Sequence, residues 1–286
     1  MPELPEVEIV KQSLEKYILN QRLLKIVVKN NKLRFPIPKN ISKKLSNLKV
    51  LDVNRKSKHV VIKFRREFSL IIHLGMSGTL HLVKNKIFNN TNLSFYHSKN
   101  LPQKHNHIFF IFRKFMIVYN DPRRFGFIKL VKDKNSFIKY FSKFGPDPFT
   151  KEFNPNYIKK YFFSKKKNIK NILIDQKFIS GIGNIYSSEI LNYSKINPLK
   201  PAHNVNSQEI DKIVYYTKKV LKLSIKRGGT TINNFHSLKG KTGTYQKEFR
   251  TYDREGKKCK NKLCLGKIIK LNISNRSTYM CNTCQK

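Results

Sequence analysis

The chain has 286 residues, with 59 Lys and Arg against 17 Asp and Glu, so its formal net charge is +42. Hydrophobic residues make up 39% of it and aromatic residues 12%, which argues against a wholly disordered basic chain and leaves room for about two or three domains. No apolar run approaches the ~20 residues that cross a bilayer, and the acidic start MPELPEVEIVKQ is unlike a secretory signal. We therefore expect a soluble cytoplasmic protein without membrane contact.

The positive charge makes a polyanion the first partner to consider, because each neutralised phosphate releases a condensed counterion. The sequence is also crowded with Lys, Asn and Ile, whose codons are rich in A and T. Mutational bias is therefore an alternative source of many lysines, and the net charge alone is a weak indication of function.

The first element is expected to be an amphipathic helix, because Val7, Val10, Leu14 and Ile18 share one face and Pro5 suits a first helical turn. Short β-rich runs follow it, separated by charged or turn-forming residues. Their spacing predicts an antiparallel sandwich or barrel rather than alternating strands and helices. The runs cover residues 23–28, 50–55, 59–64, 70–74, 107–112, 115–119 and 127–131.

Beyond Pro146 and Pro148 the pattern becomes helical. The clearest helix spans residues 207–226, with Asn206 and Glu209 spaced as a capping motif and two glycines after its last turn. Its expected buried face consists of Ile210, Ile213, Val214, Thr217, Leu221 and Ser224. A second helix is expected to start near Asn184, and the polar residues 240–244 predict a mobile loop.

The cysteines all lie in the last 28 residues, in the pattern C-x4-C-x16-C-x2-C, with an alternating segment between the pairs. Four thiolates from two turns at the end of a hairpin suit tetrahedral Zn²⁺, so we expect one structural zinc ion. The alternative is two disulfides, which a reducing cytoplasm disfavours. The first pair is looser than the usual C-x2-C. The proposed ligands are Cys259, Cys264, Cys281 and Cys284.

Acidic residues are scarce, yet Glu3, Glu6 and Glu8 all fall within the first eight positions. Carboxylates favour the positive end of a helix dipole, which accounts for Glu6 and Glu8 but not for Pro2 and Glu3. Removal of Met1 would leave Pro2 as a secondary amine with a pKa near 8, able to form an iminium with an aldehyde-level carbon. Glu3, beside Pro2, could protonate or deprotonate a sugar that carries such a carbon.

Several motifs then appear in a fixed order along the whole chain: MPELPEVE, HLGMSG at 73–78, KHNH at 104–107, DPRRFG at 121–126, GIGNIYSSE at 181–189, GGTT at 228–231 and the four-cysteine tail ending in CQK. Together they resemble the bacterial formamidopyrimidine-DNA glycosylase family. The related endonuclease VIII begins differently and is not expected to carry the Met and Arg-Phe pattern.

The resemblance implies an α+β multidomain fold, with an N-terminal β-sandwich at 1–133, a helix-two-turn-helix domain at 134–230, and a lesion loop with a zinc-finger β-hairpin at 231–286. It implies a monomer that binds damaged double-stranded DNA. It further implies a bifunctional enzyme, which excises 8-oxoguanine and formamidopyrimidines and then cleaves the abasic strand by β,δ-elimination.

By matching motif, the resemblance assigns catalytic roles to five residues. Pro2 is the expected Schiff-base nucleophile and Glu3 the acid that assists ring opening, while Glu6 orients the site or its water. Lys58 matches the lysine assigned to proton donation in β-elimination and to phosphate contact, and Arg276 matches the arginine linked to δ-elimination and phosphate binding. His105, Arg123 and Lys166 match positions that contact DNA in the family, and Arg124, Lys170 and Asn184 are further candidates for DNA contact.

Removing a base from the duplex stack leaves a hole that costs a few kcal/mol. Met76, Arg123 and Phe125 resemble the family's void-filling triad, although ordinary core packing is the alternative for Met76 and Phe125. At Asn184 the alternatives are phosphate binding and simple helix capping. His105 and His107 are not expected to bind metal, because no third ligand lies nearby in the sequence.

Two departures from the family pattern bear on the positioning of Arg276 and therefore on δ-elimination. They are the C-x4-C spacing and Asp253, which stands where the family more often has glycine. Two other hypotheses remain open at this point. One is a non-catalytic zinc-ribbon DNA-binding protein, and the other is an endonuclease VIII-like glycosylase for oxidised pyrimidines.

Overall fold

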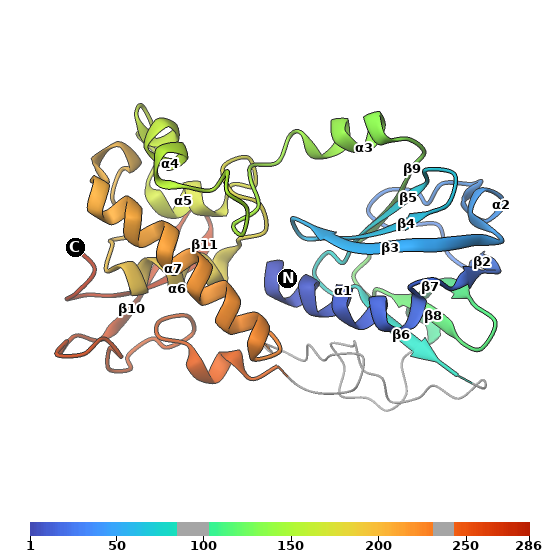
Figure 1. Cartoon of the computed structure of the whole chain (residues 1–286). Coiled ribbons are helices and arrows are strands. Elements are labelled where there is room, and N and C mark those ends of the chain that lie inside the picture. The colour runs from blue at the N-terminus through green and yellow to red at the C-terminus, as the bar shows by residue number, and fades with distance from the viewer. Residues whose placement is uncertain (85–102, 231–242) are drawn as a thin grey trace. The chain divides into compact units, whose positions relative to one another are not determined.

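The computed structural model describes residues 1–84, 103–230 and 243–286 (Figure 1). The chain forms two compact units and enters each of them twice. The first unit comprises Met1–Ser142 and Arg227–Gln246, and the second comprises Lys143–Lys226 and Lys247–Lys286. Among the described residues, no helix has the length and apolar character needed to cross a bilayer.

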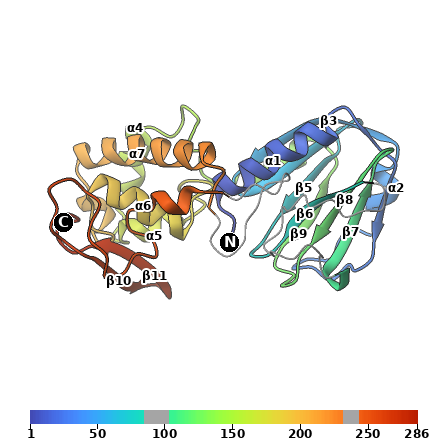
Figure 2. The same cartoon turned by 90° about the horizontal axis from the view of Figure 1, so that it is seen from below.

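The first unit is built around two antiparallel sheets, as the strand spacing predicts (Figure 2). One sheet has the order β1-β3-β4-β5-β9 and the other the order β2-β7-β8-β6. Apolar side chains such as Val60, Ile72 and Phe110 form a single buried core. The strands are β1 (Arg22–Leu23), β2 (Lys25–Val28), β3 (Leu48–Lys56), β4 (His59–Phe64), β5 (Ser69–His73), β6 (Thr79–Val83), β7 (Asn106–Ile111), β8 (Met116–Asn120) and β9 (Phe127–Val131).

Two features of the sandwich differ from the prediction. The expected run 23–28 is divided at Leu24, because β1 pairs with β3 in one sheet and β2 pairs with β7 in the other. Strand β6 is absent from the prediction, because Thr79 and His81 interrupt its apolar pattern. Both are buried, and Thr79 Oγ1 lies 2.7 Å from His81 Nε2, so the two polar groups satisfy each other inside the sandwich.

Helix α1 (Leu4–Ile18) packs on β3 and β4 and buries the face formed by Val7, Val10, Leu14 and Ile18, which confirms the predicted amphipathic helix. Two shorter helices of this unit, α2 (Ile41–Leu45) and α3 (Lys134–Phe141), are not part of the sequence prediction. Each offers only one or two buried apolar residues, too few to produce a helical period.

The second unit is mainly helical. Helix α7 (Ser207–Lys226) has the predicted bounds, and Asn206 and Glu209 cap it with two reciprocal hydrogen bonds of 2.9 Å. On its buried face Val220 is buried whereas Val214 is only half-buried. The other helices are α4 (Pro155–Phe162), α5 (Ile169–Ile174) and α6 (Asn184–Ser194), and the short 3-10 turns of the chain are η1 (Gln103–His105), η2 (Ala202–Asn204) and η3 (Tyr245–Glu248).

The C-terminal segment of the second unit forms the predicted hairpin. Strands β10 (Ile268–Ile273) and β11 (Arg276–Cys281) pair in antiparallel fashion from end to end. Ser274 and Asn275 connect them with φ values of 49° and 58°, as a two-residue turn that matches the twist of the strands requires. The hairpin therefore presents Arg276 directly after its tip.

Candidate active site and metal centre

The amino terminus lies at the start of α1, beside two buried carboxylates. Glu3 is 3% exposed and Glu6 is 2% exposed. Burial is the main cause that lowers the pKa of the Met1 amine from its ordinary 8.0. The charges of Glu3 and Glu6 oppose this shift in the amine pKa, while those of Lys58 and Arg123 add to it. An amine in this place is more readily neutral, and so more nucleophilic, than one in water.

Glu6 joins the start of α1 to a second segment of the same unit. Its Oε2 accepts a hydrogen bond from the backbone N–H of Glu3 at 3.0 Å, which forms a capping box. Its Oε1 accepts from both the backbone N–H and the hydroxyl of Thr230, each at 3.0 Å. Both carboxylate oxygens are therefore occupied, and ordinary helix capping accounts for part of the acidic N-terminus.

Lys58 lies in the tight turn between β3 and β4 and is 5% exposed. The preceding Ser57 has a φ of 54°, which fits such a turn. Arg55 ties this turn to α1, because its Nε donates to Glu8 Oε2 at 2.8 Å and its Nη1 donates to the Ser57 carbonyl at 3.1 Å. The ion pair therefore ties the turn that carries Lys58 to helix α1.

Met76, Arg123 and Phe125 lie on the turns after β5 and β8. Met76 is 38% exposed and Phe125 is 44% exposed, so neither belongs to the core. The Arg123 guanidinium carbon lies 4.8 Å from the centre of the Phe125 ring. An exposed apolar side chain, a cation and an exposed ring therefore share this surface of the first unit.

A buried carboxylate connects these two turns. The Asp121 side chain accepts hydrogen bonds from the Ser77 hydroxyl and, at 2.8 Å, from the Gly126 backbone N–H. Ser77 Oγ in turn accepts from the backbone N–H of Arg123 at 3.1 Å. The turns also meet at Gly75, whose φ is 60° and where a Cβ would lie 2.4 Å from the Gly126 nitrogen. Glycine is required at that contact.

The two histidines of the KHNH motif have different environments. His107 is fully buried, and its Nε2 lies 2.9 Å from the Asp121 carbonyl oxygen. His105 is only partly buried at the end of η1, and desolvation together with neighbouring positive charges lowers its pKa. Among the described residues, the cluster that could hold a metal ion includes neither histidine.

In the second unit, Lys170 and Lys166 differ sharply. Lys170 is 1% exposed, and its Nζ donates to Ser188 Oγ at 2.6 Å and to the Asn184 carbonyl at 3.2 Å. Lys166 is exposed. Asn184 begins α6, and its Nδ2 donates to the Ser277 carbonyl on β11 at 2.8 Å. The Asn184 side chain therefore ties α6 to the hairpin.

The hairpin tip carries an exposed Arg276. Its neighbours anchor the tip to the helices of the same unit through Asn184 and through Asn171, whose Nδ2 donates to Ser274 Oγ at 2.9 Å. Asp253 adopts a φ of 55°, a conformation that glycine takes most easily and that Asp tolerates. The departure from the family pattern at this position is therefore accommodated in the fold.

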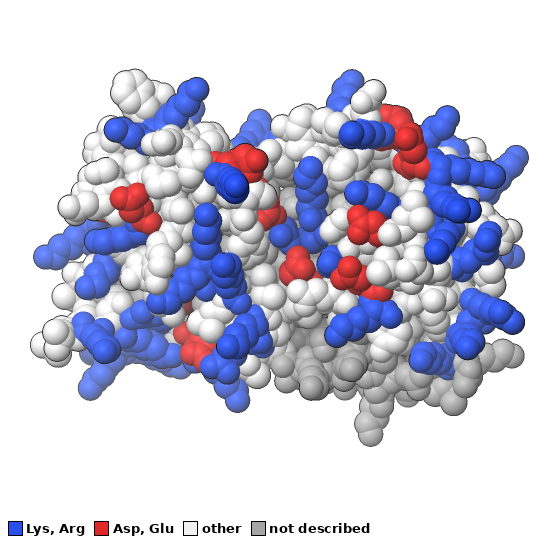
Figure 3. All heavy atoms as spheres, viewed as in Figure 1, with Lys and Arg blue, Asp and Glu red and all other residues white. Residues whose placement is uncertain are grey.

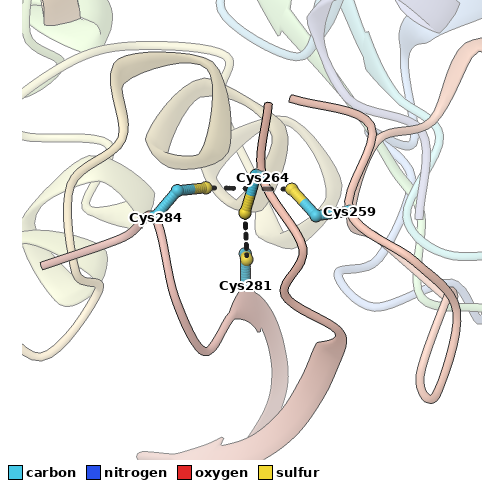
Figure 4. A group of neighbouring side chains, drawn as sticks. All are labelled: Cys259, Cys264, Cys281 and Cys284. Atoms are coloured by element: carbon cyan, nitrogen blue, oxygen red, sulfur yellow. Dashed lines mark hydrogen bonds between the residues drawn. The ribbon is translucent and has the colours of Figure 1, made fainter. Parts of the chain in front are cut away.

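The four cysteines form a compact cluster beside the hairpin (Figure 4). All four thiols are free, and their sulfurs lie within 4.8 Å of one another. Cys259 and Cys284 are separated by 3.7 Å between sulfurs, and Cys264 and Cys281 by 3.6 Å. A tetrahedron with Zn–S bonds of about 2.3 Å requires a sulfur separation of about 3.8 Å, so the cluster fits Zn²⁺ and the disulfide alternative is wrong.

Three buried positioning groups are missing from the sequence prediction: Ser77, Asp121 and Glu189. Glu189 is fully buried and accepts hydrogen bonds from the backbone N–H groups of residues 250, 251 and 252, which lead to the cysteines. Burial raises its pKa, which those three bonds oppose. Each of these residues stands inside a quoted motif, but nothing in the sequence shows which side chains turn inward.

The charge of the chain is spread over its surface. Figure 3 shows many Lys and Arg side chains on the visible face and few Asp and Glu. Several acids are already paired, as in the 2.7 Å contact between Lys200 and Glu209. The excess positive charge is thus not confined to the residues expected to contact DNA.

Two family models match the chain. The formamidopyrimidine-DNA glycosylase N-terminal domain matches residues 1–128, and the formamidopyrimidine-DNA glycosylase H2TH domain matches residues 144–236. Proteins named formamidopyrimidine-DNA glycosylase are similar over their full length. The one from Zymomonas mobilis is 36% identical and one from Wolbachia is 37% identical, with 100% of both chains covered.

Solved structures agree. A Lactococcus lactis Fpg mutant in complex with Fapy-dG-containing DNA has a TM-score of 0.88 at 29% identity, with 100% of both chains covered. The L. lactis Fpg bound to abasic-site DNA has a TM-score of 0.87 at the same identity, with 99% of both chains covered.

The fold and these matches define a DNA glycosylase of base excision repair. The chain belongs to the formamidopyrimidine-DNA glycosylase family.

Proposed function

We propose that the amine of Pro2, exposed by removal of Met1, is the nucleophile of a bifunctional glycosylase and lyase acting on oxidised purines in duplex DNA. The observation that carries this proposal is the environment of the amino terminus, where burial and two cations lower the pKa of the Met1 amine, one residue before Pro2 and beside buried carboxylates. Such an amine attacks the sugar carbon that bears the damaged base, and the base leaves as the bond to the amine forms.

The other groups of the first unit support the same reaction. Glu3 is assigned the protonation of the opening sugar ring, and Lys58 is assigned the role of proton donor during β-elimination. Glu6 has both oxygens engaged with Glu3 and Thr230, so it orients the start of α1 and does not act as a base. Met76, Arg123 and Phe125 are exposed together and suit insertion into the space that the extruded base leaves.

The second unit supplies further DNA contacts and the metal centre. The groups assigned to phosphate contact are Arg276 at the hairpin tip, the exposed Lys166, and Asn184, which also holds strand β11 through the Ser277 carbonyl. His105 and Arg124 of the first unit are assigned to the same class of contact. Zn²⁺ held by the four cysteines stabilises the hairpin, and the protein is expected to hold one equivalent of zinc that a chelator removes together with DNA binding.

For the domain organisation, we infer functional segments at 1–133, 134–230 and 231–286. The limits of the two family models, 128 and 144, support the first boundary. The compact units divide the chain at Ser142 and Arg227 instead, because α3 and the described residues 227–230 and 243–246 belong to the first unit. We further infer a monomer, which light scattering of the purified protein tests.

Borohydride trapping is the decisive experiment. The protein is incubated with duplex DNA containing 8-oxoguanine opposite cytosine, and reduction is expected to yield a covalent protein–DNA adduct. Replacing Pro2 by Gly leaves a terminal amine in an altered geometry and is expected to weaken trapping strongly, whereas Lys84→Met, at an exposed position, is expected to retain it. Full trapping without Pro2, or no adduct with zinc-loaded protein, would contradict the proposal.

The two alternatives predict different results for DNA binding and base excision. A non-catalytic DNA-binding protein would bind damaged and undamaged duplex equally, in a salt-sensitive manner, and would cleave neither. An endonuclease VIII-like enzyme would excise thymine glycol faster than 8-oxoguanine. This comparison is informative because one structure of the L. lactis protein contains DNA with an oxidised pyrimidine.

A further inference from the structure

The longer first cysteine pair brings one polar side chain against the metal-binding sulfurs. Asn261 is 8% exposed, and its Nδ2 donates to Cys284 Sγ at 2.9 Å. Its backbone N–H donates to Cys259 Sγ at 3.4 Å. One residue therefore supplies N–H donors to sulfurs from both cysteine pairs.

The C-x4-C spacing explains how Asn261 reaches this position. The turn closes with a hydrogen bond of 3.1 Å from the backbone N–H of Cys264 to the Asn261 carbonyl. Leu263 follows with a φ of 61° and a fully exposed side chain, and Lys262 is exposed as well. Asn261 is thus the inward-facing residue of the extra length, whereas Leu263 and Lys262 face solvent.

Arg250 fixes the orientation of the Asn261 amide. Its Nη2 donates to Asn261 Oδ1 and, at 2.8 Å, to the Lys260 carbonyl. A guanidinium can only donate, so the oxygen of the amide faces Arg250 and its NH₂ group faces Cys284. Arg250 is itself held by Glu189, which accepts its backbone N–H at 2.9 Å, and by Tyr193, whose ring centre lies 4.4 Å from the guanidinium carbon.

We propose that Asn261 is a positioning residue of the metal centre, which holds the sulfurs of Cys284 and Cys259 in their binding geometry and slows the loss of the metal. Four thiolates around a divalent cation leave an excess of negative charge, and N–H donors to sulfur disperse it. Groups of this kind around a metal site commonly change metal affinity by about 10-fold to 100-fold. The inference rests on the zinc site proposed above.

The test measures zinc release from the full-length, zinc-loaded protein to a chelating dye. Asn261→Ala is expected to release zinc about 10-fold faster than the unsubstituted protein. Asn261→Asp is expected to release it faster still, because it places a carboxylate beside thiolates. Asn272→Ala is the matched control, since Asn272 is exposed on β10 of the same hairpin and is expected to leave the rate unchanged.

A spectroscopic readout separates this role from general support of the fold. In the Co²⁺-substituted protein, loss of an N–H donor raises the energy of the sulfur lone pairs. The sulfur-to-cobalt charge-transfer band is therefore expected at longer wavelength in Asn261→Ala and at its original position in Asn272→Ala. Arg250→Lys keeps the positive charge but loses the forked donor, so it is expected to accelerate zinc release less than Asn261→Ala does. When both substitutions are combined, the release rate is expected to equal that of Asn261→Ala alone.

The outcomes are distinguishable. Asn261→Ala protein with the release rate and band position of the unsubstituted protein would overturn this inference and leave the zinc site intact. An unsubstituted protein that retains no zinc would overturn the zinc site and, with it, this inference. If Asn261→Ala does not fold, Asn261→Gln carries the same test, because its longer side chain keeps the amide but displaces its donor from Cys284.

Discussion

The hydroxyl of Ser77 donates a hydrogen bond to the buried carboxylate of Asp121, and this bond joins the turn that carries Met76 to the turn that carries Arg123. Asp121 is fully buried and also accepts from the Gly126 backbone. One buried carboxylate thus fixes the relative positions of the two turns that carry Met76, Arg123 and Phe125, the side chains expected to enter the duplex.

Ser77→Ala is expected to disturb the relative positions of these two turns. It removes one partner of Asp121 and leaves the backbone N–H of Arg123 without its acceptor, at a cost to stability of about 1 kcal/mol. Displacement of the turns is expected to lower the single-turnover excision of 8-oxoguanine by about 10-fold to 100-fold, measured well below the unfolding temperature.

Tyr119→Phe is the matched control, because the Tyr119 hydroxyl donates to the same carboxylate at 3.3 Å from strand β8 and not from either turn. It is expected to reduce stability with a smaller effect on excision. Equal losses of excision in the two variants would show that Asp121 acts on the stability of the sandwich and not on the register of the turns.

The two lysines considered for DNA contact in the second unit should respond differently to substitution. Lys170→Met removes a buried donor to Ser188 and to the Asn184 carbonyl, so it is expected to reduce the stability of the protein by about 1–3 kcal/mol. Lys166→Met, at an exposed position, is expected to change stability by less than about 0.5 kcal/mol. If Lys166 contacts a phosphate, the DNA-binding constant of that variant should depend less steeply on salt. The slope of its logarithm against the logarithm of the salt concentration should be smaller in magnitude by about 1.

Chemical denaturation and salt-dependent DNA binding check both expectations. Lys84→Met is the control for bulk charge, because Lys84 is exposed and is not among the residues assigned to DNA contact. Excision in that variant should stay near its original rate. A Lys166→Met protein with an unchanged salt slope would remove Lys166 from the DNA-binding surface.

The sequence predicted some of this site better than the rest. The strands β4 and β9 and helix α7 have the expected bounds, because short β-rich runs between turn-forming residues and the Asn206–Glu209 cap are local signals. Strand β6 and the Ser77–Asp121 bond depend on which polar groups meet across the sandwich, and no local pattern encodes that pairing. Lys166 and Lys170 look alike in a lysine-rich segment, and only the packing of α5 against α6 separates the buried one from the exposed one.

The half-buried His73 and the buried His81 make the first unit sensitive to acid. Desolvation is the main cause that lowers the pKa of His73 and of His81 to about 3, so both are neutral in the folded protein. In the unfolded chain they bind protons below a pKa of about 6.5. The unfolded state therefore binds more protons between about pH 6.5 and pH 3, and the free energy of unfolding should fall as the pH is lowered through that window.

Thermal unfolding between pH 8 and pH 4 measures this effect. His81→Gln removes one of the two titrating groups, so its unfolding temperature should depend less steeply on pH below about 6.5. His203→Gln alters an exposed histidine in the second unit and serves as the control, with the original slope expected. An undiminished slope in His81→Gln would show that other groups cause the sensitivity to acid.

The amino terminus gives a prediction about the pH dependence of the chemistry itself. Schiff-base formation requires the neutral amine. Burial together with the charges of Lys58 and Arg123 lowers the pKa of the Met1 amine from 8.0, and we expect the same surroundings to lower the pKa of the Pro2 amine. The rate of borohydride trapping on DNA that already contains an abasic site should therefore rise with pH. The midpoint of this rising limb of the pH–rate profile is expected below pH 8. Lys58→Met removes one of the two cations, so the amine pKa rises and the limb moves to higher pH.

In Lys84→Met the limb should stay in place, since Lys84 is not among the charges that act on the amine. A limb that stays fixed or moves to lower pH in Lys58→Met would mean that Lys58 does not tune the nucleophile.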